Sequence, residues 1–152
     1  MSQISSVKNA SKVMLTMGIY ALVISVLWIF ITDVMFVSDF EAYTGQPYSD
    51  YLTSSPKPAQ MFLIAKRLIG IERLATALLI VIITQNSYRK AEKWSWYALL
   101  IAGTLTWGSV LGERIAIGYI ATTGVATPII GLILLIIGLA LPAKEIFSSK
   151  NS

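Results

Sequence analysis

Seven ionisable side chains lie inside segments that are otherwise apolar, and their types suit ion pairing, acid–base chemistry or the binding of a small charged ligand. They are Asp33, Lys66, Arg67, Glu72, Arg73, Glu113 and Arg114. A charge at the centre of a membrane helix costs about 2.5–3.5 kcal/mol on the insertion scale. Each of these groups therefore needs a partner or water, and three acids with four bases come close to neutralising one another.

These groups fall at two depths when each is counted from the inner end of its apolar segment. At about 1.5 Å per helical residue, Asp33 lies roughly 30 Å from that end, Lys66 roughly 26 Å and Glu113 roughly 28 Å. Three separate segments thus bring charge to one outer level. Glu72 and Arg73 lie deeper, at about 17–18 Å, near the midplane of an apolar core about 30 Å thick.

Helical geometry predicts how the deeper groups are directed. Lys66 and Arg73 are seven residues apart and share one face of their helix, and Gly70 lies between them on the same stripe. This glycine opens space beside two long basic side chains. Glu72 points in another direction and suits a base from a neighbouring helix, for which Arg114 is the candidate.

At the outer level we expect Asp33 and Glu113 to be the partners of Lys66 and Arg67. The outer half of the protein then holds a paired polar network, and the inner half is a dry apolar seal. Two interpretations stay open. The charges form either buried ion pairs that fix the register of the helices or an outward-facing pocket for a ligand or ion.

Four long apolar segments must position these groups. The 152 residues are 55% hydrophobic and only 13% charged, with a mean hydropathy of +0.69, whereas soluble domains average about 25% charged residues. A span needs roughly 20 apolar residues. The sequence predicts an all-α integral membrane bundle of four transmembrane helices in a single domain, residues 1–152. The expected spans are residues 13–37, 60–84, 94–119 and 124–142.

The connecting segments predict the orientation. Residues 38–59 form the expected outer loop, in which Pro47, Pro56 and Pro58 exclude a continuous helix, and the last span is expected to stop at Pro142. Cytoplasmic loops are rich in Lys and Arg. The bases assigned to the inner side are Lys8, Lys12, Arg89, Lys90, Lys93, Lys144 and Lys150. We therefore expect a multi-pass protein of the cell membrane with both termini in the cytoplasm. The net charge of +4 then reflects topology and contact with the bilayer, with no nucleic-acid partner.

Glycines predict where helices pack closely. Gly124, Gly131 and Gly138 recur every seven residues on one stripe of the last span. Gly108 and Gly112 form a G-x-x-x-G pair in the third span. Small residues let helix backbones approach in lipid, so these positions, together with the glycine in the second span, are expected to hold the bundle together. Self-association is the alternative.

The chain has no cysteine and no histidine, which narrows its chemistry. Thiol catalysis, histidine-ligated metal sites and histidine general-base catalysis are excluded. A membrane enzyme would have to use Glu72 or Glu113 as a general acid or base, without a recognisable nucleophile, metal cage or phosphate loop. We therefore expect no enzymatic activity and no cofactor.

The connection between the second and third spans reads YRKAEKWSWYALL, residues Tyr88–Leu100. It resembles a YRRGERWAWY-like pattern of uncharacterised small four-span prokaryotic membrane proteins. The matching residues are Arg89, Glu92, Trp94, Trp96 and Tyr97. Lys90 and Lys93 are conservative replacements, and Ala91 stands where the pattern has glycine. The resemblance implies four helices and a prokaryotic source, and it implies no activity.

Two functions fit these features. The first is a non-enzymatic accessory or structural component packed against a larger membrane complex. The second is a transporter or binding protein for a small anionic solute, with an outer-half basic pocket formed by Lys66, Arg67 and Arg73.

Overall fold

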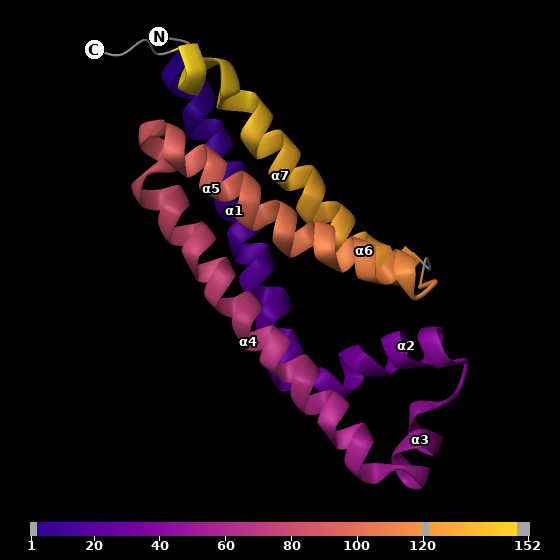
Figure 1. The fold of residues 1–152 in the computed structure, drawn as a ribbon. Helices are drawn as coiled ribbons and strands as arrows, with labels where there is room; N and C mark the ends of the chain where they lie inside the picture. Colours follow the sequence, from indigo (N-terminus) through magenta and orange to yellow (C-terminus); the bar gives the residue numbers. More distant parts are fainter. Residues whose placement is uncertain (1–2, 120–121, 149–152) are drawn as a thin grey trace.

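The computed structural model describes residues 3–119 and 122–148, and this part of the chain is almost entirely helical. The elements are α1 (Gln3–Phe30), α2 (Thr32–Thr44), α3 (Tyr48–Ser54), α4 (Pro56–Asn86), the 3-10 turn η1 (Tyr88–Lys90), α5 (Lys93–Gly103), the π-helical turn η2 (Thr104–Gly108), α6 (Ser109–Ala116) and α7 (Thr122–Ser148). The long helix α1 packs along both α4 and α7. The short helices α2 and α3 lie together at one end of α4 (Figure 1).

Three helical segments are long and apolar enough to cross a membrane: Ser5–Phe30, Pro56–Lys90 and Gly124–Ser148. A fourth rod is built from α5, η2 and α6 in succession (Figure 1). Its backbone stays helical at both junctions, with φ −66° and ψ −44° at Thr104 and φ −67° and ψ −40° at Gly108. At about 1.5 Å per residue the rod is roughly 36 Å long.

The first apolar segment does not run as one helix to residue 37. α1 ends at Phe30, and Ile31 leaves helical geometry with φ −124° and ψ 40° before α2 begins at Thr32. The Thr32 hydroxyl donates a hydrogen bond to the Trp28 carbonyl, and such back-bonding bends helices. The chain therefore turns away from the axis of α1 (Figure 1).

The expected outer loop, residues 38–59, is mostly helical. It contains the second half of α2, all of α3 and the start of α4. Gly45 ends α2 in the left-handed conformation with φ 69°, where glycine has no steric penalty. Pro47 precedes α3, and Pro56 is the first residue of α4. Prolines start helices well because the first turn does not need their missing N–H, so here they separate two helices without preventing them.

The last helix passes through Pro142 and continues to Ser148, so the helix itself does not stop at the expected end of the fourth span. Proline at this position has no N–H to donate to the carbonyl of Gly138, four residues earlier. The buried Tyr88 hydroxyl donates to that carbonyl at 2.5 Å. A side chain from η1 therefore replaces the missing backbone bond, which is how membrane helices tolerate proline.

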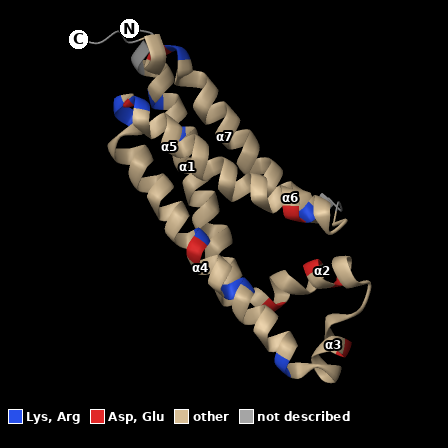
Figure 2. Ribbon diagram, in the orientation of Figure 1, with Lys and Arg blue, Asp and Glu red and all other residues tan. Residues whose placement is uncertain are grey.

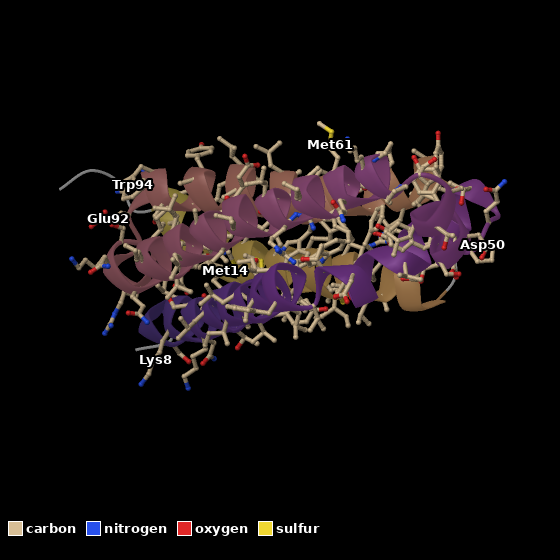
Figure 3. The ribbon with its side chains drawn as sticks, turned by 90° about the horizontal axis from the view of Figure 1, so that it is seen from below. Lys8, Met14, Asp50, Met61, Glu92 and Trp94 are labelled. Atoms are coloured by element: carbon tan, nitrogen blue, oxygen red, sulfur yellow. The ribbon has the colours of Figure 1, made fainter. Side chains whose placement is uncertain are left out.

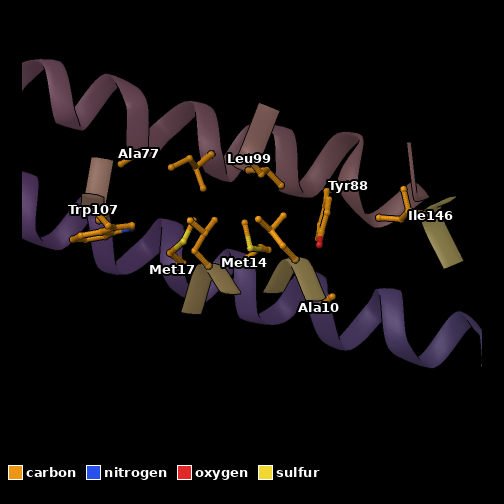
Figure 4. Packing of buried hydrophobic residues seen from close by; sticks show 12 residues of the cluster. Ala10, Met14, Met17, Ala77, Tyr88, Leu99, Trp107 and Ile146 are labelled. Carbon is orange, nitrogen blue, oxygen red and sulfur yellow. The ribbon is translucent and has the colours of Figure 1, made fainter. Parts of the chain in front are cut away.

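Apolar side chains fill the half of the bundle where α1 begins and α7 ends. Met14 and Met17 of α1 meet Ile80 of α4, Leu99 of α5 and Leu135 of α7 in one buried cluster. Figure 4 shows the two methionines at its centre. This half of the molecule therefore has an apolar interior.

Glycine positions show where the helices approach most closely. A Cβ at Gly131 would collide with the ring of Trp107, and one at Gly138 with Met14. A Cβ at Gly70 would lie 3.1 Å from Trp28 Cβ, so α4 crosses α1 there. A Cβ at Gly124 would lie 2.5 Å from the Tyr119 ring.

The predicted G-x-x-x-G contact is wrong for the described part of the chain. A Cβ at Gly112 would meet nothing within 4 Å, and one at Gly108 would meet only Thr104 of the preceding turn. The α5–α7 approach instead uses Gly103, where a Cβ would lie 2.5 Å from Leu135.

Candidate functional site

Four ionisable side chains from three helices form a connected cluster in the half of the bundle that contains α2 and α6. Lys66 of α4 forms an ion pair with Glu113 of α6 at 2.7 Å and lies 3.9 Å from Asp39 of α2. Asp39 also pairs with Arg114 of α6. Its carboxylate is 5% exposed. The buried acid therefore links two bases on different helices, which ties α2, α4 and α6 together.

The turn at Ile31 is what brings Asp39 into this cluster. It directs α2 across the end of the bundle (Figure 1). Phe36 and Phe40, on the same face of α2, are buried against Tyr48 of α3 and Ala59 of α4. The Tyr48 hydroxyl donates to the Ala59 carbonyl at 2.9 Å. Aromatic packing thus fixes α2, and α2 in turn fixes the acid.

Aromatic rings surround the bases of this cluster. Lys66 Nζ lies 5.5 Å from the ring centroid of Trp28 and 5.9 Å from that of Phe36. The Arg73 guanidinium lies 6.0 Å from the Trp28 ring, and that of Arg114 lies 5.0 Å from the Tyr119 ring. Cation–π contacts of this kind are worth about 0.5–2 kcal/mol, most where water is excluded. Lys66 and Arg73 share one face of α4, as their spacing predicts, and both lie beside Trp28.

A cavity of about 270 Å³ lies beside the cluster, between α1, α2, α6 and α7. Trp28, Asp39, Arg73, Trp107 and Arg114 are among its lining residues. The indole Nε1 of Trp107 is buried and finds no hydrogen-bond acceptor in the described part of the chain. The cavity wall therefore carries two guanidinium groups, the unused indole N–H of Trp107 and one carboxylate.

The structure brings together four of the seven residues predicted for the polar network: Lys66, Arg73, Glu113 and Arg114. The expected pairing of Lys66 with Glu113 is observed. The other three, Asp33, Arg67 and Glu72, are exposed and enter no ion pair among the described residues.

Three pairings differ from the prediction. Asp33 does not pair with the bases of α4, because the turn at Ile31 changes its direction. Arg67 projects to the outside of α4. Arg114 pairs with Asp39 and not with Glu72.

Asp39 is the cluster member that sequence reasoning missed, because it was assigned to the outer loop. One signal was present. Phe36, Phe40 and Tyr43 follow the i, i+4, i+7 spacing of an amphipathic helix. That spacing indicates that α2 continues beyond residue 37 and packs one face. Asp39, next to Phe40, then falls beside the packed face.

The chemistry of the cluster is ionic and aromatic. Among residues 3–119 and 122–148, no three Asp or Glu side chains gather in a way that could hold a metal ion. Comparison with protein-family models, with curated proteins and with solved structures finds no match to this chain. The structure itself shows an all-α fold with three helices long and apolar enough to span a membrane.

Proposed function

We propose that this chain is a multi-pass protein of the cell membrane with four spans and with both termini in the cytoplasm. The rod formed by α5, η2 and α6 supplies the fourth span. α1 begins and α7 ends at the same end of the bundle (Figure 1), which fits an even number of crossings. Bases gather at that end, and acids predominate on α2 and α3 at the other end (Figure 2), as the positive-inside rule requires.

Within the membrane, we propose a non-enzymatic role as an accessory or structural component of a larger complex. The observation that supports this role is the position of Glu72. It lies near the middle of α4, it is exposed, and it enters no ion pair among the described residues. Ionisable residues at membrane depth almost always face a protein interior or a water-filled cavity.

The surroundings of Glu72 make its exposure costly in lipid. Leu68 and Leu79 lie on the same side of α4, at the i−4 and i+7 positions, and are 55% and 56% exposed. Ala75, at i+3, is exposed as well. A carboxylate in this apolar stripe needs a donor, and residues 3–119 and 122–148 provide none. A second helix bearing Lys, Arg or a hydrogen-bond donor would satisfy it.

The test places a photo-crosslinking amino acid at Ala75 in native membranes and compares the wild-type chain with Glu72→Leu. We expect one membrane protein to be crosslinked in stoichiometric yield and the yield to fall at least tenfold in the variant, which corresponds to about 1.4 kcal/mol. Asp50→Leu is the control, because it removes an exposed acid on α3, outside the spans. A wild-type chain that never crosslinks to another chain refutes the proposal.

A charge exchange identifies the contact directly. If the crosslinked partner carries a base at the site, Glu72→Lys should abolish the complex, and an acid at the partner position should restore it. A crosslinked second copy of this chain would make the complex a homo-oligomer. Loss of the complex with no rescue by the exchange would show that Glu72 acts through folding.

A second candidate function is the binding of a small anionic solute in the outer cavity. Arg73 and Trp107 favour it, because the guanidinium has no carboxylate partner among the described residues and the indole N–H is unused. Titration of phosphate, sulfate and acetate should change the fluorescence of Trp28 and Trp107 in the cavity wall. Arg73→Gln should remove the response, and Arg67→Gln, an exposed base on the same helix, should preserve it. Equal responses in both variants refute this candidate.

A further inference from the structure

A second concave site lies at the opposite end of the bundle, far from the cluster of Asp39, Lys66, Glu113 and Arg114. It is a groove of about 630 Å³ between the first turns of α1, the end of α4, η1 and the last turns of α7. Four bases line it: Lys8, Lys12, Arg89 and Lys90. None of the four forms an ion pair with any described residue. Figure 3 shows Lys8 at the end of the molecule opposite Asp50.

The fold makes these four bases converge. Lys8 and Lys12 are one helical turn apart on α1 and share a face. Arg89 and Lys90 belong to η1, which Tyr88 anchors to α7 through the Gly138 carbonyl. The turn then reverses at Ala91, whose φ is 60°. Two flexible bases and two bases on an anchored turn thus face one groove.

We propose that this groove binds the phosphate headgroup of an anionic membrane phospholipid. Basic pockets between membrane helices on the cytoplasmic side are suited to such headgroups. The proposal rests on the chain spanning a membrane and is independent of any partner at Glu72. Arg89 and Lys90 of the groove lie at the end of the candidate span Pro56–Lys90, which is where a membrane helix reaches the headgroup layer.

The wall of the groove explains why a lipid fits better than free phosphate. Val7 and Leu15 supply apolar surface next to the bases. The stripe of α1 that begins with Lys8 and Lys12 continues through Leu15 to Ile19 and Val23 at helical spacing. The last two are 50% and 53% exposed. A phospholipid whose phosphate is held by the bases would therefore have its acyl chains directed along an exposed apolar face of α1.

One acid in the lining refines the headgroup chemistry. The Oε2 atom of Glu145 is buried and has no hydrogen-bond partner in the described ranges. A carboxylate oxygen accepts hydrogen bonds and donates none when ionised. A headgroup that carries hydroxyl groups beside its phosphate, as phosphatidylglycerol does, satisfies the bases and this acid together.

The experiment measures lipid retention and competition on the full chain in mild detergent. Native mass spectrometry follows binding of phosphatidylglycerol and of phosphatidylcholine, which has the same phosphate but no net charge. We expect phosphatidylglycerol to bind at least tenfold more tightly. The double variant Lys12→Gln/Arg89→Gln should weaken it by roughly tenfold or more. Lys93→Gln/Lys144→Gln is the matched control, since it removes the same charge from exposed bases at the same end that do not line the groove.

Each outcome bears on the proposal. Loss of affinity in the groove variant, little change in the control, and rescue by the charge-preserving Lys12→Arg/Arg89→Lys support it. Equal losses in the two glutamine variants show a diffuse electrostatic attraction and overturn it. Competition by inorganic phosphate or glycerol phosphate at the affinity of the lipid would assign the groove to a soluble phosphate and overturn the lipid assignment. Circular dichroism of each variant verifies that the helices are intact.

Discussion

The hydrogen bond from Tyr88 to the Gly138 carbonyl should stabilise the fold only because Pro142, four residues after Gly138, has no N–H to donate to that carbonyl. Tyr88→Phe keeps the ring, which is fully buried, and removes the hydroxyl that donates at 2.5 Å. The carbonyl is then left without a donor in an apolar interior. A buried acceptor without a partner costs about 1–3 kcal/mol, and measured side-chain bonds in membrane proteins lie toward the lower end. We expect a loss of about 1–2 kcal/mol in the free energy of unfolding.

Pro142→Ala restores a backbone N–H that can donate to the same carbonyl. In that background Tyr88→Phe should cost less than about 0.5 kcal/mol, because the carbonyl keeps a partner. The double-mutant cycle should therefore give a coupling energy of about 1 kcal/mol. Tyr97→Phe is the control, since Tyr97 is 52% exposed and donates no described hydrogen bond. It should be close to neutral in both backgrounds.

The assay is equilibrium unfolding in mixed micelles, with increasing sodium dodecyl sulfate and helicity followed by circular dichroism. The wild-type chain, the two single variants and the double variant are compared under the same conditions. An equal cost of Tyr88→Phe with and without Pro142 would refute the reasoning, because the hydroxyl would then stabilise the fold through some other contact. A neutral Tyr88→Phe in the wild-type background would refute it as well.

Three further predictions use the same unfolding assay. Asp39→Asn should destabilise the protein by about 3 kcal/mol or more, because it leaves buried bases without their acid, whereas Asp33→Asn should be near neutral; equal effects would contradict the assignment. Gly131→Ala should destabilise by about 1–3 kcal/mol, since its methyl group collides with the indole ring above it, and Gly112→Ala should cost nothing by this mechanism. Ala91→Gly should stabilise by about 1 kcal/mol, because φ at this residue is 60° and glycine adopts that conformation without strain; an unchanged midpoint would argue against strain there.

Hydrophobic runs of this length made the helices predictable. Residues 60–84 and 124–142 lie within α4 and α7, because long apolar runs have few alternatives to helix in lipid. The resemblance to a pattern with glycine at position 91 agrees with the left-handed backbone at Ala91, although the family itself stays a prediction. Local sequence patterns are sufficient to predict a helix where lipid permits no other backbone conformation.

The directions of the helices in space were less predictable than the existence of the helices. Nothing in the sequence around Ile31 marks a break as glycine or proline would, yet the Thr32 hydroxyl and the packing of Phe36 turn the chain there. Glu113 pairs with Lys66 as expected, but the second acid near Lys66 depends on that turn: it is Asp39 and not Asp33. The continuation of α7 through Pro142 was unpredictable for the same reason, since it depends on the Tyr88 hydroxyl, which bonds to the carbonyl of Gly138, fifty residues away from Tyr88 in the chain. Likewise, residue spacing predicts which face of a helix Gly112 lies on. It does not predict whether another helix packs against that face.

Arg67 and Glu72 differ in how easily their charges reach water, and this difference supports a partner protein packed against α4. Both are exposed on this helix and neither has an ion pair in the part of the chain that the structure describes. Arg67 lies about 7.5 Å nearer the outer end of the helix, and its long side chain can reach the interface while its stem stays apolar. Glu72 has a shorter side chain and lies about 21 Å from the nearer end of α4.

The remaining charges at membrane depth are accommodated within the chain. Lys66, Glu113 and Arg114 have ionic partners, and Arg73 lies beside Trp28. A fold that arranges partners for these groups leaves one carboxylate facing outward at mid-helix. A carboxyl group in hydrocarbon needs a hydrogen-bond partner. A base or donor on a second helix meets that requirement, and this is why the accessory role is preferred to a chain that functions alone.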